Sequence, residues 1–247
     1  MDPTAAGPSD PLMAADARTE ALAAIEGEVV VCTRCPRLVA WREQAAETKV
    51  ARFADRAYWG RPVPSFGDPN AGIVVIGLAP AAHGGNRTGR IFTGDRSGDF
   101  LFASLYRTGF ANQPTSTHRN DGLRLDGMWV AAVNRCAPPA NRPTPEERDA
   151  CLPYLERELD VLEDANVLVC LGAFAWDGAL RALAAIGHVA RPKPRFGHGA
   201  EADVGPFRLL GAFHPSQQNT FTGKLTPAML DAIFVRARAL GRRDPRE

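Results

Sequence analysis

Four short apolar runs alternate with helix-forming segments along most of the chain, and this alternation restricts the folds open to it. The runs cover residues 71–77, 128–134, 166–172 and 207–213. Each is rich in Val, Ile, Leu or Ala, which is typical of strands buried on both faces of a parallel sheet. The sequence therefore predicts an α/β fold, a three-layer α/β/α sandwich around a four-stranded, mostly parallel sheet.

Helix signals follow the runs. Residues 97–109 predict a helix with Ser97 as its N-cap, and Thr144-Pro145-Glu146-Glu147 combines a capping Thr, a Pro at the first helical position and acidic residues in the first turn. Two further helices are expected over 173–187 and 226–240.

The N-terminal part reads differently. Residues 1–12 are rich in Pro, Ala, Gly, Ser and Asp and predict a disordered tail, followed by a single domain over 13–247. Within that domain we expect a helix over 16–31 and a long ordered loop over 48–70. No apolar run reaches the roughly 20 residues of a membrane span, and the chain does not begin like a signal peptide, so a cytoplasmic protein is expected.

The charge balance excludes a general polycation, because the formal net charge is only +1. A local basic face remains possible, and arginine suits forked contacts to phosphate. The basic residues expected near the working edge of the sheet are Arg52, Arg56, Arg61, Arg87, Arg90, Arg135, Arg142 and Lys224.

Ligands of parallel sheets bind beyond the carboxyl ends of the strands, which nominates the loops 77–94, 134–142 and 214–224 and the turn after Leu171. The first of these loops matches neither the P-loop nor the dinucleotide fingerprint. Asn134 ends a strand, where its amide suits the Watson–Crick edge of a base or, alternatively, a bond to the neighbouring turn. His214 follows a strand, a position that is structural about as often as catalytic.

Four of the five cysteines fall into two spaced pairs, Cys32-x2-Cys35 and Cys136-x14-Cys151. Four thiolates can hold either zinc or a [4Fe–4S] cluster, and the spacing does not choose between them. Cys170 lies inside an apolar run and is expected to be a buried core thiol.

Taken together, these motifs resemble the uracil-DNA glycosylase superfamily, and within it family 5, the bacterial iron–sulfur type. Gly77-Leu78-Ala79-Pro80-Ala81 resembles the first family motif, and His214-Pro215-Ser216 resembles the second. The stretch from Asn134 to Cys151, with its NRPTPE sequence, is also typical of the family, and the resemblance extends from about Cys32 to Leu240.

The resemblance implies a role for each matching residue. Phe92 would stack on an extruded base, Asn134 would read uracil at N3 and O4, and His214 would stabilise the negative charge that develops at O2. The first motif lacks the Asp or Asn that holds the attacking water in related families. Backbone carbonyls or another polar group are expected to take that part, and the candidate side chains are Asp95 and Asn86. Residues expected to contact DNA are Ser216, Gln217, Gln218, Arg87 and Lys224.

The resemblance also favours a structural [4Fe–4S] cluster over zinc on Cys32, Cys35, Cys136 and Cys151. The small Ala81 leaves room in the pocket wall, so hypoxanthine, xanthine and ethenocytosine are expected substrates beside uracil.

The expected protein is therefore a monomeric, monofunctional DNA glycosylase of the bacterial nucleoid that acts on double- and single-stranded DNA and leaves an abasic site. The alternatives are a strict family 4-like uracil glycosylase, a silent or covalent uracil-DNA binder, and an iron–sulfur electron carrier. The GLAPA form of the first motif argues against the family 4 type. No basic insert of the covalent type lies beside Phe92.

Overall fold

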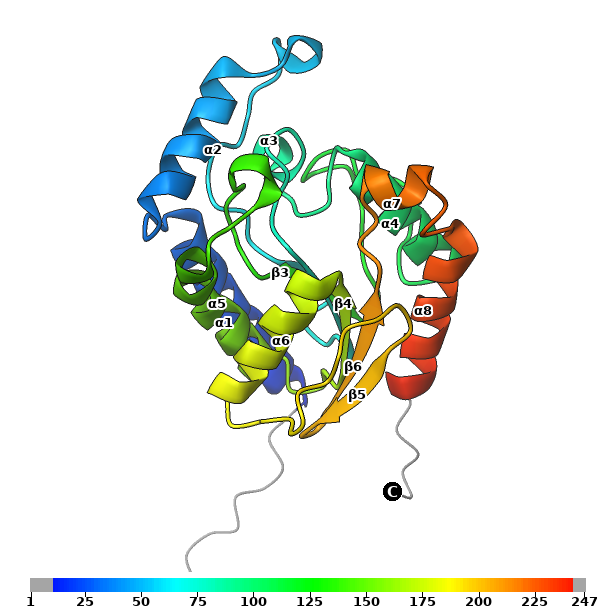
Figure 1. Ribbon diagram of the computed structural model, residues 1–247. Helices are drawn as coiled ribbons and strands as arrows, with labels where there is room; N and C mark the ends of the chain where they lie inside the picture. Colours follow the sequence, from blue (N-terminus) through cyan, green and yellow to red (C-terminus); the bar gives the residue numbers. More distant parts are fainter. Residues whose placement is uncertain (1–10, 242–247) are drawn as a thin grey trace, which may run out of the picture.

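The computed structural model (Figure 1) describes residues 11–241. It contains a six-stranded sheet in the order β1-β3-β2-β4-β6-β5. The four inner strands, β3, β2, β4 and β6, are parallel to one another, and they coincide with the four predicted runs. The strands are β1 (Phe66–Gly67), β2 (Ile73–Gly77), β3 (Met128–Ala132), β4 (Val167–Leu171), β5 (Glu201–Val204) and β6 (Phe207–Ala212).

Side chains of the inner strands alternate between two hydrophobic clusters, one on each face of the sheet. In β2, Val75 packs on one face, whereas Val74 and Ile76 pack on the other. Helices α4 (Arg96–Arg107) and α8 (Pro227–Gly241) cover the first face; α1 (Pro11–Val30), α5 (Pro145–Val161) and α6 (Ala173–Ala185) cover the second (Figure 1). The predicted three-layer α/β/α class is confirmed.

The strand count differs from the prediction because two short strands add to the edges of the sheet. β1 has two residues and β5 has four, and both are antiparallel to their neighbours. The sequence of β5, Glu-Ala-Asp-Val, lacks a continuous apolar run because only one of its residues is buried. Neither edge strand therefore has the continuous apolar run that is typical of a buried parallel strand, and neither was predicted.

The N-terminal region contains one helix more than predicted. α1 begins at Pro11 rather than Asp16, and the expected tail over 1–12 lies outside the described residues except for its last two positions. Pro36 then opens α2 (Pro36–Thr48) directly after Cys35, which the sequence analysis did not predict. α1 is held to the body by ion pairs, including Arg18 with Asp164 at 2.6 Å.

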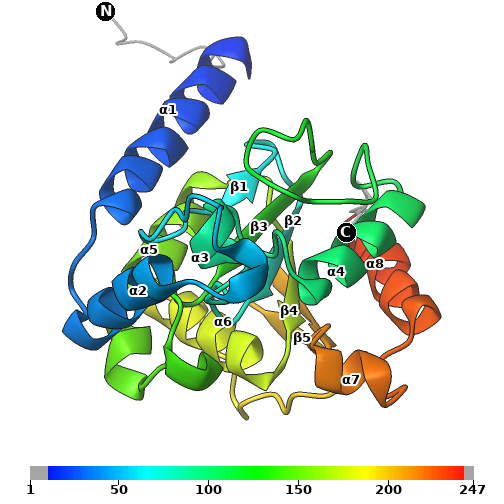
Figure 2. The ribbon, with the colours of Figure 1, turned by 90° about the horizontal axis from the view of Figure 1, so that it is seen from above.

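Short elements interrupt the loops at the carboxyl edge of the sheet, which Figure 2 shows from above. They are α3 (Gly85–Thr88), α7 (Gln217–Phe221) and the 3-10 turns Ala51–Phe53 and Pro139–Asn141. The N-cap of α4 is Asp95 rather than the predicted Ser97, and its carboxylate accepts a bond from the Gly98 amide. No helix within residues 11–241 has the length and apolar character needed to cross a membrane.

The predicted start of α5 is confirmed and takes the form of a capping box. The Thr144 hydroxyl accepts from the Glu147 amide, and the Glu147 carboxylate accepts from the Thr144 amide at 2.8 Å. Glu147 also pairs with Arg37 of α2 at 2.6 Å, so the start of α5 fixes α2 as well.

Thr144→Ala removes the hydroxyl half of this box, and we expect it to lower the free energy of unfolding by about 1 kcal/mol. The matched control is Thr115→Ala, at an exposed loop position outside the helix ends. Urea unfolding followed by circular dichroism measures both variants; equal midpoints for the two would contradict the assignment.

Candidate active site

A cavity of about 470 Å³ opens at the carboxyl edge of the sheet, between the loop after β2 and the loop after β6. Seven of the predicted site residues line it together. They are Ala81, Phe92, Asp95, His214, Ser216, Gln217 and Gln218. The parallel register of β2, β4 and β6 brings these loops, which are distant in sequence, to one place.

The ring of Phe92 is held in its position by two glycines. A Cβ built on Gly77, the last residue of β2, would lie 2.6 Å from the Phe92 Cζ, and a Cβ on Gly98 would lie 1.8 Å from the Phe92 carbonyl oxygen. Phe92 itself adopts a left-handed backbone conformation with φ of 52°. Such a conformation is unfavourable for a bulky residue and persists only where the surroundings enforce it.

His214 lies across from Phe92 in the same cavity. Their ring centroids are 5.9 Å apart with an angle of 36° between the planes. Although the side chain is partly exposed to the cavity, burial lowers the pKa of His214 to about 4, so its imidazole is neutral at physiological pH. The main chain at His214 is fixed by Asn219, whose Nδ2 donates to the His214 carbonyl oxygen at 2.9 Å.

Asp95 combines a structural bond with a place in the cavity wall. Its Oδ1 caps α4, and its Oδ2 lies so close to Gly84 that a Cβ there would meet it at 2.0 Å. Burial raises the pKa of the Asp95 carboxyl, against the lowering effect of the amides of Gly98 and Ser97. A carboxyl group with a raised pKa at a cavity wall is a common feature of catalytic sites.

Asn86, the second residue expected to hold water, is fully buried and is not among the residues that line the cavity. Its Nδ2 donates to the main-chain oxygen of Arg42 in α2 at 3.0 Å, and its amide donates to the carbonyl of Ala81 at 3.1 Å. The geometry therefore gives Asn86 a scaffolding position that joins α2 to the first motif.

Asn134 is likewise buried, at 0% exposure, and lines the cavity of the four paired cysteines rather than this one. Its main-chain amide donates to the Leu78 carbonyl, and its Nδ2 donates to the Glu147 carbonyl at 2.9 Å. The Oδ1 has no hydrogen-bond partner within the described part of the chain. Phe92 and His214 are thus brought together as predicted, whereas the side chain of Asn134 is not in the cavity with them.

Three polar residues of the wall were missed by the sequence analysis as site residues: Arg96, Ser97 and Asn141. Asn141 follows Ala140 in a turn where both residues have positive φ, of 56° and 52°. Asn adopts this conformation more readily than most residues. The Ala-Asn pair between the prolines at 139 and 143 was therefore the sequence feature that could have indicated a turn with Asn141 at the site.

Two of the basic residues expected near the working edge of the sheet lie in the interior instead. Arg90 and Arg135 are buried, and ion pairs with Asp121 and Glu158 hold them there, so neither belongs to an exposed basic face. Four others are exposed: Arg52, Arg56, Arg61 and Arg142. Arg87 donates to the carbonyls of His83 and Gly94 and braces the loop.

Gln217 and Gln218 are exposed and line the cavity, and Ser216 caps α7. Lys224 is exposed and lies over the ring of Phe213, at 4.8 Å from its centroid.

The four paired cysteines line one small cavity, although they come from four separate segments. Cys32 follows α1, Cys35 precedes α2, Cys136 follows β3 and Cys151 lies in α5. Within residues 11–241, no group of three or more Cys, His, Asp and Glu side chains is arranged to hold a metal ion. Cys170 is fully buried in the core, as predicted.

The surroundings of these thiols fit a metal–thiolate centre. Arg42 donates to the Cys136 sulfur at 3.0 Å, and the Arg135 amide donates to the Cys151 sulfur at 3.3 Å. Burial raises the pKa of Cys136 to about 11 and that of Cys151 to about 12, so both are protonated at neutral pH as free thiols. Donors directed at sulfur are typical of thiolates that carry charge on a metal.

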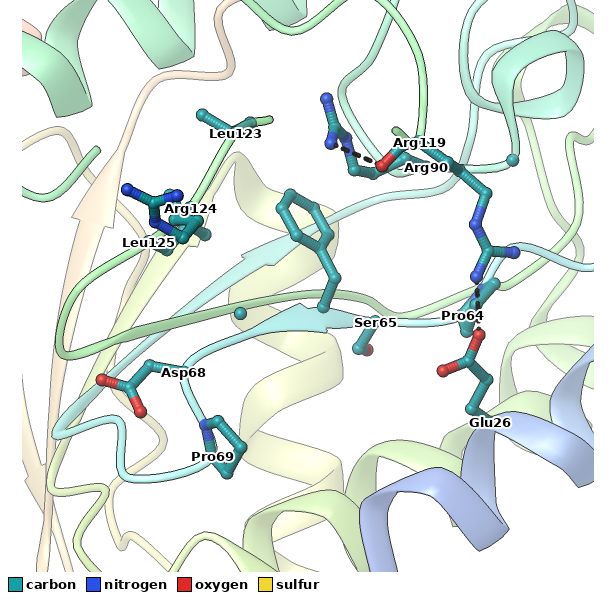
Figure 3. A pocket seen from close by; sticks show the side chains of 13 residues that line it. Glu26, Pro64, Ser65, Asp68, Pro69, Arg90, Arg119, Leu123, Arg124 and Leu125 are labelled. Atoms are coloured by element: carbon teal, nitrogen blue, oxygen red, sulfur yellow. Dashed lines mark hydrogen bonds and ion pairs between the residues drawn. The ribbon is translucent and has the colours of Figure 1, made fainter. Parts of the chain in front are cut away.

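A second cavity, of about 440 Å³, runs along β1 between α1 and the loop 118–125 (Figure 3). Two of its arginines are already paired: Arg119 with Glu26 at 2.8 Å and Arg90 with Asp121 at 2.6 Å. None of the predicted catalytic, base-binding or cysteine residues lines it. The cavity between the motif loops is therefore the candidate active site.

Comparison with known proteins identifies the family of the chain. Residues 64–238 match the family model described as the uracil DNA glycosylase superfamily. The chain is 54% identical to the type-5 uracil-DNA glycosylase of Mycobacterium bovis over 214 residues, which are 86% of this chain and 79% of the relative. It is 47% identical to the type-5 enzyme of Thermus thermophilus over 213 residues, covering 86% and 94% of the two chains.

Similarity to type-4 enzymes is more limited. The type-4 uracil-DNA glycosylase of Archaeoglobus fulgidus is 37% identical over 114 residues, which are 46% of this chain.

The fold and the two motif loops thus define a DNA glycosylase, and the chain belongs to the uracil-DNA glycosylase superfamily. Within the superfamily it belongs to family 5, whose members are named type-5 uracil-DNA glycosylases. The expected enzyme class, a hydrolase of N-glycosyl bonds, is confirmed at the level of the family.

Gly98→Ala tests the seat of Phe92. The added methyl group meets the Phe92 carbonyl at 1.8 Å and must displace it, so we expect base excision to fall by at least about 10-fold through a misplaced ring. Single-turnover kinetics on a uracil-containing oligonucleotide measure the effect.

The control is Gly27→Ala, in the helix α1, where a Cβ meets nothing within 4 Å. It should keep full activity and gain up to about 1 kcal/mol of stability from helix propensity. Full activity in Gly98→Ala would show that the position of Phe92 is unimportant.

Proposed function

We propose that this chain excises uracil from DNA by hydrolysing the N-glycosidic bond, leaving an abasic site as the first step of base-excision repair. The observation that carries the proposal is the pairing of an aromatic ring with a neutral imidazole, Phe92 and His214, across one cavity at the edge of the sheet. The names of the type-5 relatives support uracil as the base.

Phe92 and His214 divide the work on the base. A nucleotide extruded from the duplex stacks on the Phe92 ring, at about 1–3 kcal/mol for a base on an aromatic face. As the glycosidic bond stretches, negative charge accumulates on the uracil O2, where a neutral His214 donates a hydrogen bond. A preorganised donor of this kind contributes about 3–4 kcal/mol to transition-state stabilisation.

Asp95 is the wall residue best suited to hold the water that attacks the sugar. It carries the only carboxyl group among the residues that line the cavity. Its raised pKa reflects a partly desolvated environment in which the carboxylate accepts a proton more readily. Asn86, buried behind the loop, supports the wall instead.

The reading of the base edge involves the Asn134 carboxamide. Its unpartnered Oδ1 offers the acceptor that a uracil N3–H needs, but the side chain does not line the cavity. Contact therefore requires a local rearrangement when a base enters. Exposed Asn141 supplies a second carboxamide at the cavity wall.

We also propose that the cavity accepts a wider range of bases than uracil. Ala81 contributes only a methyl group to the wall, and the volume of about 470 Å³ leaves room for a bicyclic base. We therefore include hypoxanthine, xanthine and ethenocytosine as substrates. Because no lysine is among the residues that line the cavity, we propose a reaction without strand cleavage through a Schiff base.

Gln217 and Gln218, which are exposed at the cavity, and the exposed Lys224 are proposed to contact the DNA backbone, in duplex or single-stranded substrates. Cys32, Cys35, Cys136 and Cys151 are proposed to hold a [4Fe–4S] cluster, with zinc as the alternative occupant. Such a centre would cross-link α1, α2, β3 and α5 without entering the reaction. The monomeric state and the cellular location remain predictions.

The defining experiment uses a labelled duplex with one uracil, incubated with the purified protein and then treated with alkali. Strand scission that appears only after alkali supports a monofunctional glycosylase. An intact strand, or a covalent adduct, supports a binding protein instead. Parallel duplexes with hypoxanthine, xanthine and ethenocytosine test the base range, and activity on uracil alone would reject the roomy pocket.

His214→Ala is expected to slow base release by about 10 to 10³-fold, because the donor to O2 is lost. Asn134→Ala is expected to slow base release by a factor in the same range. Single-turnover rates on the uracil duplex measure both, and full activity in both variants would remove these residues from the site.

Asp95→Asn separates the two parts that Asp95 plays. Asn is as good an N-cap as Asp, so the thermal stability should change little, whereas base excision should fall by about 10²-fold or more. Asp95→Ala should lose both stability and activity. An active Asp95→Asn enzyme would show that the carboxylate serves only as the cap of α4.

The pH dependence tests the neutral imidazole. With a pKa of about 4 in the fold against an ordinary 6.5, His214 should not titrate between pH 5 and 8, and the single-turnover rate should show no inflection near 6.5 from this residue. The unfolded chain takes up the proton first, so this residue makes stability fall as the pH drops from about 6.5 towards 4. An inflection near pH 6.5 that disappears in His214→Asn would contradict the assignment.

A further inference from the structure

Three arginines within residues 11–241 are buried, and two of them have an obvious counter-charge. Arg90 pairs with Asp121 at 2.6 Å, and Arg135 pairs with Glu158 at 2.7 Å; both carboxylates are at most 6% exposed. Pairing of this kind is what a buried guanidinium requires, since an unpaired charge in the interior costs several kcal/mol.

Arg42 is the exception. It is 4% exposed, and the ion pair recorded for it is with Glu43 at 3.6 Å, a carboxylate with a 60% exposed side chain. Its Nε has no hydrogen-bond partner. A solvated carboxylate at that distance offsets little of the charge.

The remaining contacts of Arg42 point to the cysteine cavity. One nitrogen, Nη1, donates to both the Cys136 sulfur at 3.0 Å and the Cys32 main-chain oxygen at 3.1 Å. Arg42 and all four paired cysteines line this cavity together. The place where a counter-charge is missing is therefore the place where four sulfur ligands meet.

We infer that Arg42 is the counter-cation of an anionic tetrathiolate metal centre at Cys32, Cys35, Cys136 and Cys151. This inference rests on the proposed metal centre and adds its charge and its electrostatic partner. Four thiolates around a core of charge +2, whether zinc or the oxidised cluster, leave a net charge of −2. Arg42 does not ligate the metal; it offsets this charge and donates to a ligating sulfur.

A consequence follows for the redox properties of a cluster at this site. One-electron reduction makes the centre more negative, and a buried cation with an N–H···S bond stabilises the reduced form more than the oxidised form. Arg42 should therefore raise the reduction potential of the cluster.

The chain offers a matched control in Arg34. It lines the same cavity and carries the same charge, but it is exposed, donates to the Ala150 carbonyl and stacks over Tyr154. Solvent screens its charge, so its removal should have little effect on the centre.

The experiment compares the anaerobically purified wild-type protein with Arg42→Met, Arg42→Lys and Arg34→Met. Metal and sulfide contents of the wild type are measured first. The rate of metal loss to an excess of chelator is then followed, together with the reduction potential where iron is present. Circular dichroism confirms that each holoprotein is folded.

We expect Arg42→Met to lose metal about 10 to 100 times faster than the wild type and to have a lower reduction potential. Arg42→Lys should lie between the two because it keeps the charge, and Arg34→Met should stay within about twofold of the wild type.

Equal behaviour of Arg42→Met and Arg34→Met would overturn the inference, as would equal loss in Arg42→Met and Arg42→Lys, which would indicate packing rather than charge. If Arg42→Met does not fold, the comparison of Arg42→Lys with Arg34→Met decides. The inference is overturned if the lysine variant loses metal as slowly as the wild type while Arg34→Met loses it faster. A wild-type protein without bound metal overturns both the centre and the role of Arg42. Uracil excision is assayed separately and does not enter this comparison.

Discussion

The site depends on the close contact between the Phe92 segment and two glycines, Gly77 and Gly98. At 1.8 Å from a hypothetical Cβ on Gly98, the Phe92 carbonyl leaves no space for any side chain there. This contact fixes a left-handed residue in the loop and holds its ring over the end of β2. The His214 ring lies across the cavity from it, with 5.9 Å between the two ring centroids. Strain at one residue is thus balanced by the packing of a strand end against a helix start.

A second layer of contacts supports the wall from behind. Asn86 joins the first motif to α2, and Glu147 joins α5 to α2 through Arg37. Asn134 ties the end of β3 to both the first motif and α5. The cavity is therefore lined by loops whose positions are fixed by buried carboxamides and one ion pair rather than by the loops themselves. This arrangement meets the requirement for preorganised groups in catalysis.

Much of this could be predicted from the sequence, for identifiable reasons. The inner strands could be predicted because both faces of the sheet are buried. Neighbouring residues such as Val74 and Val75 pack on opposite faces, and both are apolar, so each strand is a continuous apolar run. The edge strands and α2 were missed: β1 is only two residues long, and α2 is marked mainly by Pro36.

The residues of the site show the same division. Motif positions placed Phe92 and His214 correctly at the carboxyl edge. Sequence position does not determine whether a polar side chain faces the cavity or the interior, which is why Asn86, Arg90 and Arg135 were assigned to the wrong side. Their burial depends on partners distant in sequence, such as Glu158 for Arg135.

The hydrogen bond between Asn86 and the main chain of Arg42 has a consequence for the effect of cysteine oxidation on the site. Arg42 donates to the Cys136 sulfur, Asn86 donates to the Arg42 carbonyl, and the Asn86 main-chain amide donates to the Ala81 carbonyl in the first motif. Three hydrogen bonds therefore link the sulfur to the wall of the base cavity. Oxidation of that sulfur adds bulk and polarity in a tightly packed space. Oxidation at Cys136 would therefore disturb the hydrogen bonds that support the first-motif loop at the cavity wall.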